Sequence, residues 1–134
     1  MTAINKIISA QADTFDKEKW IAEKNAELTN AYAMIEETLM DMKEDFSVLP
    51  KILSVIARFE RMSVANNLLI AHQKSNATKL MDTNSINSAG GYINKGARGI
   101  ILLEPGNEFK RKDGSTARKI NTKKMFDISQ TNLY

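Results

Sequence analysis

A short basic stretch with glycine spacing, residues 94–99, has the residue types for anion binding. Glycines let another group approach the backbone closely, and exposed backbone N–H groups attract anions. Lys95 and Arg98 flank this backbone, which makes them candidate phosphate contacts. The Gly91-to-Gly96 spacing resembles that of a P-loop, but the Lys-Ser/Thr pair of the P-loop motif is absent. A P-loop is also followed by a helix, whereas here a strand is expected to follow. The GXXG loop of KH domains joins two helices, so that match fails as well.

Aromatic side chains accompany these basic residues. Tyr92 precedes Lys95 by three positions, and Phe109 and Phe126 lie in or beside the basic segment that follows. Cations that meet phosphates, together with rings that stack on bases, are typical of single-strand nucleic-acid binders. We expect Tyr92 to stack on a base and Phe126 to lie in the core. The candidate phosphate contacts are Lys95, Arg98, Lys123 and Lys124.

Polar side chains also gather on the helix expected at residues 64–74, where Ser63 is the expected N-cap. Asparagine has poor helix propensity, so contacts must explain Asn66 and Asn67. Gln73 follows Asn66 by seven residues and lies on nearly the same helix face. Two explanations stay open: hydrogen bonds to a nucleic acid, or capping of neighbouring loops. The candidate nucleic-acid contacts here are Ser63, Asn66, Asn67 and Gln73.

The residue types needed for catalysis are sparse. The chain has one histidine, His72, and no cysteine, so a metal site would have to be built from carboxylates. Most carboxylates fall on the first helix, where a solvated face is the ordinary explanation. Serines are frequent, but no nucleophile-elbow motif is present. We therefore expect a protein that is not an enzyme and that uses no metal or cofactor.

Charge is divided unevenly along the 134 residues, which carry a net charge of +3. Residues 1–49 contain ten acids and five bases, whereas residues 95–124 contain nine bases and three acids. Such asymmetry fits a polyanion partner, although a solvated basic loop explains it equally well. No apolar run reaches the roughly 18 residues of a membrane span, and the N-terminus lacks a signal-peptide core. We expect a cytoplasmic protein without membrane contact.

A long helix is expected at residues 14–44, which lack Gly and Pro. Its apolar residues form a stripe from Leu28 to Phe46 with alternating spacings of four and three. The stripe predicts a face that packs on the core, and the alternative is a coiled-coil seam for self-association. The members of the stripe are Leu28, Tyr32, Ile35, Leu39, Met42 and Phe46.

The remaining chain predicts a single α+β domain in which N-terminal helices pack on a small antiparallel hairpin or three-stranded sheet. A second helix follows Pro50, which suits a first helical turn, and a short helix ends at Gly90. The expected elements after the third helix are a short strand at 78–81, a strand at 99–104 stopped by Pro105-Gly106, a long, mobile basic loop at 106–122, and a strand at 123–131.

Three segments in order resemble one known family, the ArdC-type (LtrC-like) antirestriction proteins of conjugative elements, in their N-terminal domain. The segments are "SVANNLLIAHQKSNAT", "GGYINKGARGIILLEP" and "FDISQT". The matched positions are Ser63, Asn66, Leu68, Leu69, Ile70, Gln73, Ala77, Thr78, Ile93, Lys95, Gly96, Gly99, Ile100, Pro105 and Phe126 to Thr131. The resemblance covers about residues 45–131, and we expect residues 1–46 to form an acidic helical extension and residues 47–131 the ArdC-like region.

The resemblance implies binding of single-stranded DNA with little sequence preference, in protection of incoming plasmid DNA. In that family a zinc metalloprotease-like domain usually follows, and this chain has no His-Glu-x-x-His. It therefore resembles the isolated N-terminal domain, either cut from a longer parent or occurring alone. Two positions depart from the family pattern: Ile86 stands where a Trp is usual, and Gly91 where an Arg is frequent. The alternative function is a protein-interaction or oligomerisation module that binds no nucleic acid.

Overall fold

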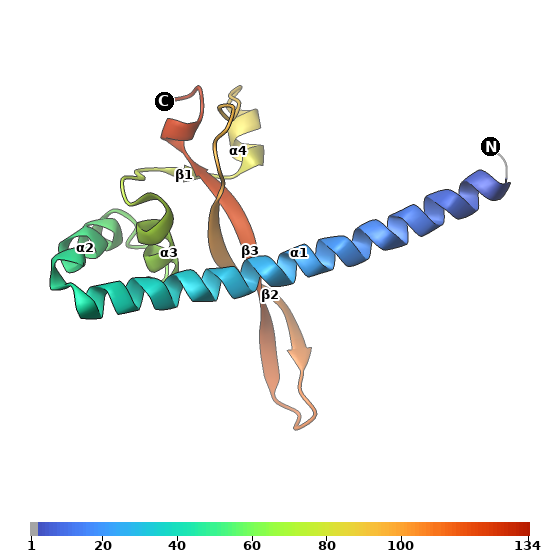
Figure 1. Ribbon diagram of the computed structural model, residues 1–134, viewed down its shortest axis with the longest axis horizontal. Helices are drawn as coiled ribbons and strands as arrows, with labels where there is room; N and C mark the ends of the chain where they lie inside the picture. The colour runs from blue at the N-terminus through green and yellow to red at the C-terminus, as the bar shows by residue number, and fades with distance from the viewer. Residues whose placement is uncertain (1–2) are drawn as a thin grey trace.

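The fold is an antiparallel sheet covered by helices, as the computed structural model shows for residues 3–134 (Figure 1). The sheet order is β1-β3-β2, so β2 is an edge strand. This architecture confirms the predicted α+β class. The elements are α1 (Ala3–Glu44), η1 (Phe46–Val48), α2 (Leu49–Arg58), α3 (Val64–Lys74), β1 (Leu80–Met81), α4 (Thr83–Ser88), β2 (Ile100–Lys110), β3 (Thr116–Asp127) and η2 (Ile128–Gln130).

Helix α1 crosses the β2–β3 hairpin, and its N-terminal half extends beyond the body of the molecule (Figure 1). Its second half joins the core through Ala31 and Met34, and Thr38 is buried beside them. The fully buried positions therefore lie one residue before members of the predicted stripe, of which Ile35 and Met42 pack against the core as predicted. Small side chains at 31 and 38 let the helix approach its neighbours closely, and the Thr38 hydroxyl is satisfied by the carbonyl of Met34 at 2.8 Å. Of the predicted stripe, Tyr32, Leu39 and Phe46 are exposed.

Helices α2 and α3 supply most of the core. Pro50 stands in the first turn of α2, and Ser63 caps α3 by accepting a hydrogen bond from the Asn66 N–H at 3.1 Å, as the sequence predicts. The apolar face of α3 meets the buried part of β2 and the second half of α1, and α2 packs against α3. The fully buried members of this core with the largest side chains are Leu69, Ile70, Leu102 and Val55.

The hairpin differs most from the prediction, because residues predicted as a long loop at 106–122 are mostly strand. Pro105 does not end β2; it stands at a bulge, with the register shifted between Pro105 and Glu108. The N–H groups of Ile101 and Leu103 point away from β3. Because backbone direction alternates along a strand, the backbone nitrogen of Pro105 also points away from β3. A proline there costs no hydrogen bond of the ladder. The turn is short, with Gly114 at a φ of +87°.

The C-terminal strand also ends earlier than predicted, because Asp127 starts a helical turn. Its carboxylate accepts hydrogen bonds from the N–H groups of Thr78 and Lys79, at 2.8 and 3.0 Å, and from Ser129. Strand β1 is shorter than residues 78–81 but pairs with β3 beside this carboxylate. The short helix α4 ends at Ser88, and Gly90 follows its C-cap with a φ of +77°, which confirms the predicted helix stop.

Candidate nucleic-acid interface

The amides of Asn66 and Gln73 bind the free edge of the sheet. Asn66 Nδ2 donates to the Leu103 carbonyl at 3.0 Å and Asn66 Oδ1 accepts from the Leu103 N–H at 2.8 Å. Gln73 makes the same pair of bonds with Ile101, at 2.8 and 2.9 Å. Because they are seven residues apart on α3, the two amides pair with the backbone N–H and carbonyl groups of two β2 residues that face away from β3. These amides hold the helix to the edge strand.

Asn67 and Ser63 also have structural contacts. Asn67 is 1% exposed, and its Nδ2 lies within hydrogen-bond distance of the carbonyls of Phe59, Met62 and Ser63. These carbonyls lie where α2 ends and α3 begins, so the amide fixes that turn. The Ser63 hydroxyl serves as the cap of α3. For the polar cluster on α3, the structure thus favours the capping explanation over direct nucleic-acid contact.

The loop at residues 91–99 presents the other predicted contacts to solvent. Tyr92 is 63% exposed, and Lys95 and Arg98 are exposed. Gln130 holds the loop in place. Its side-chain Nε2 donates to the Arg98 carbonyl at 2.9 Å, and its backbone carbonyl accepts from the Asn94 N–H at 2.8 Å. The two basic side chains and the Tyr92 ring are therefore carried on a loop with a defined backbone.

Lys123 and Lys124 point to opposite faces of β3, and carboxylates lie near both. Lys124 Nζ lies 3.2 Å from Glu27 on α1, and Lys123 Nζ lies 4.0 Å from Glu104. Glu27 also accepts hydrogen bonds from Thr122 at 2.9 Å and from Lys24 at 3.2 Å. Burial raises the pKa of Glu27, but these hydrogen bonds lower it by more, so Glu27 stays ionised. Lys124 therefore joins α1 to the hairpin instead of standing free for phosphate.

The distal hairpin, which we define as residues 106–120, carries most of the exposed positive charge. It holds five cations and two carboxylates, and every one of these side chains is exposed. Only the Arg118–Glu108 ion pair, at 3.1 Å, links two of them within the described part of the chain. The cations are Lys110, Arg111, Lys112, Arg118 and Lys119.

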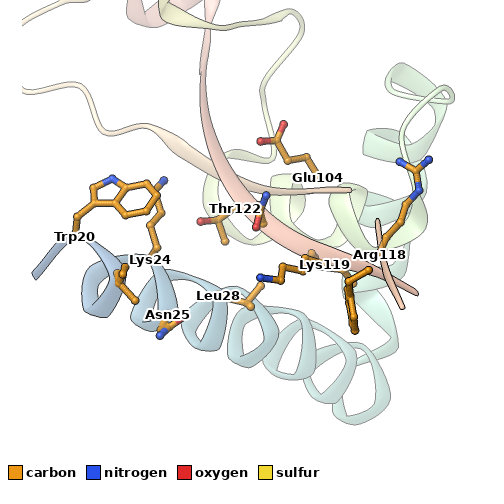
Figure 2. Close-up of a pocket in the computed structure, with 12 residues that line it drawn as sticks. Trp20, Lys24, Asn25, Leu28, Glu104, Arg118, Lys119 and Thr122 are labelled. Atoms are coloured by element: carbon orange, nitrogen blue, oxygen red, sulfur yellow. The ribbon is translucent and has the colours of Figure 1, made fainter. Parts of the chain in front are cut away.

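A cleft of about 730 Å³ lies between the hairpin and the middle part of α1, from Trp20 to Leu28 (Figure 2). Trp20 and Lys24 line it from α1, and Phe109, Arg118 and Lys119 line it from the hairpin. Trp20 and Phe109 are 58% and 42% exposed, which is unusual for large rings that serve only packing. The cleft therefore combines exposed rings with cations.

Sequence reasoning did not assign the α1 side of this cleft. Phe109 was recognised beside the basic segment, but Trp20 and Lys24 fall on a helix whose charge is acidic overall. A local signal exists, because Trp20 and Lys24 are four residues apart and share a helix face. Their relation to the hairpin depends on a contact between residues far apart in the chain, such as Glu27 with Thr122.

Three comparisons, with models of protein families, with curated proteins and with solved structures, find no significant match for this chain. The resemblance to ArdC-type proteins therefore stays a prediction. Among the helices that the structure describes, none has an apolar stretch long enough to cross a membrane.

Proposed function

We propose that this protein binds single-stranded DNA with little sequence preference. The observation that carries the proposal is the distal hairpin, a two-stranded ribbon with five exposed cations that projects from the body (Figure 1). These charged side chains make few contacts with the rest of the protein, so the fold does not need them for packing. They are suited to contact the phosphates of an extended strand. The exposed loop with Tyr92, Lys95 and Arg98 is a second contact region.

Two further features support a single strand over a duplex. Exposed rings, Tyr92 on the loop and Phe109 on the hairpin, accompany the cations. Base stacking on aromatic side chains needs bases whose faces are open, and it tolerates any sequence. The resemblance to ArdC-type proteins points the same way, and with it we propose a cytoplasmic antirestriction role for a conjugative or other mobile element, without catalysis by this chain.

The proposal is tested by removing charge from the distal hairpin and, as a matched control, from exposed positions near α2, outside the hairpin. The triple variant Lys110→Gln, Arg111→Gln, Lys112→Gln removes two lysines and one arginine from the hairpin. The control Lys43→Gln, Lys51→Gln, Arg61→Gln removes the same charges from exposed positions on and beside the first two helices. Fluorescence anisotropy with a labelled oligothymidine should show weaker binding for the hairpin variant only. Equal losses would contradict the proposal, as would equal affinity of the wild type for duplex DNA.

A second candidate function rests on exposed apolar side chains of α1 and of the adjoining η1. Tyr32, Leu39 and Phe46 are 43%, 44% and 75% exposed, and they were predicted as members of one stripe. Self-association of two copies along this stripe would cover them. Light scattering of the purified chain separates the two candidates: a monomer at high concentration contradicts the interaction module and leaves DNA binding untouched.

A further inference from the structure

We infer that the cleft between α1 and the distal hairpin is the site where unstacked bases of the single strand are held. This inference rests on the proposed function and extends it, because it gives the acidic helix a direct part in binding. The cleft volume of about 730 Å³ falls within the roughly 300–1,000 Å³ typical of ligand sites.

Large aromatic rings stand on both walls of the cleft. Trp20 stands on the helix wall and Phe109 on the hairpin wall, and both are about half exposed. Ile21 and Ile120, 43% and 46% exposed, extend the apolar surface on the same two walls. Exposed apolar groups on facing walls favour a ligand with flat, apolar faces, and nucleobases have such faces.

The charges at the cleft decide the class of ligand. Its lining contains three cations, Lys24, Arg118 and Lys119, and one carboxylate, Glu104. Lys24 lies 3.2 Å from Glu27, and Arg118 lies 3.1 Å from Glu108, so each of these two cations has a carboxylate partner within the protein. Lys119 pairs with no carboxylate in the part of the chain that the structure describes, which leaves its charge for a phosphate. Cations beside rings are the combination that a single strand requires.

The position of α1 explains how the two walls are kept apart. Glu27 joins the helix to Thr122 and Lys124 of β3 at the inner end of the cleft. Beyond this contact the helix and the hairpin diverge, and Trp20 lies on the diverging part of α1 (Figures 1 and 2). The cleft is therefore open at its outer end, so a strand can enter without any part of the fold being displaced.

Trp20 is the only tryptophan of the chain, so its fluorescence reports on this cleft alone. The full chain is titrated with unlabelled oligothymidine while Trp20 emission is recorded, and affinity is measured separately by anisotropy with a labelled strand. The expected result is quenching of Trp20 at the same concentrations at which the anisotropy rises. Trp20→Ala and Phe109→Ala should each weaken binding roughly 5- to 150-fold, the range for one lost base stack. Trp20→Phe should recover part of the loss.

The matched control is Tyr32→Ala, which removes an equally exposed ring from α1 outside the cleft and should leave affinity unchanged. Binding by anisotropy with unchanged Trp20 emission and full affinity of Trp20→Ala would overturn the cleft assignment and leave the proposed function standing. No binding of the oligothymidine at low salt would overturn both. Equal quenching of Trp20 emission by duplex DNA would also overturn the assignment. So would a change in Trp20 emission that follows protein concentration alone and accompanies dimer formation.

Discussion

At the scale of residues, the side chains that stand out in the sequence mostly hold the fold together. Asn66, Gln73 and Gln130 each use their amide to bind the backbone of a segment distant in sequence. Asp127 collects backbone N–H groups from two segments. A carboxamide has both a donor and an acceptor, so it can complete an edge strand as a neighbouring strand would. The segments on which the predicted resemblance to ArdC-type proteins rests thus make contacts that specify the architecture.

Removing one of these amides should destabilise the protein. We expect Gln73→Ala to lower the free energy of unfolding by about 1–3 kcal/mol, because the N–H and carbonyl of Ile101 lose their partners in a half-buried place. Urea denaturation followed by circular dichroism measures the change. Asn30→Ala, at an exposed position on α1, is the control and should match the wild type or exceed it slightly. Equal stability of the two variants would show that the edge contacts contribute nothing.

Asp127 should make stability depend on pH in the acid range. Burial raises the pKa of its carboxyl, but hydrogen bonds from Ser129, Lys79 and Thr78 lower it by more, so the pKa in the folded state lies below the ordinary 3.8. The ionised carboxylate therefore stabilises the fold above the ordinary pKa, and this contribution is lost as the pH falls through the lower, folded-state value.

Urea denaturation across this acid range tests the linkage with a variant that cannot ionise. Asp127→Asn should be less stable than the wild type at neutral pH, by about 1–3 kcal/mol. It should also lose less stability than the wild type on acidification. The exposed Asp41→Asn on α1 serves as the control. A constant difference between Asp127→Asn and the wild type at every pH would contradict the assignment.

At the scale of elements, the sequence predicted what depends on local pattern. The helices, the Ser63 cap, the stop at Gly90 and the start of the hairpin follow from periodicity and turn residues. The distal hairpin was predicted as a loop because polar side chains face solvent on both sides, which hides strand alternation. The crossing of α1 over the hairpin could not be predicted, since it depends on contacts such as Glu27 with Thr122, 95 residues apart.

The two halves of α1 should differ in local stability. Side chains from Asp16 to Glu23 are exposed, whereas Ala31, Met34 and Thr38 are buried against the core. Backbone hydrogen bonds without packed side chains open more easily. Hydrogen exchange followed by mass spectrometry should show faster exchange for residues 16–22 than for residues 31–38. Equal protection of the two segments in a monomer would mean that an additional contact covers the first half.

At the scale of the whole molecule, opposite charges are placed on crossing elements. The acidic helix α1 meets the basic hairpin at Glu27 and Lys124, which neutralise each other at the crossing point. Away from this point the cations of the distal hairpin remain exposed. The net charge of only +3 therefore understates the attraction that the hairpin side offers to a polyanion.

The dependence of oligothymidine affinity on salt tests this account most directly. A strand that neutralises about four cations should give a slope of roughly −3 for the logarithm of the association constant against the logarithm of salt concentration. Fluorescence anisotropy of a labelled strand of about 16 nucleotides, titrated with the full chain at several potassium chloride concentrations, measures that slope. We expect tight binding at low salt that weakens along this slope. Binding that is insensitive to salt, or no binding at low salt, would contradict it.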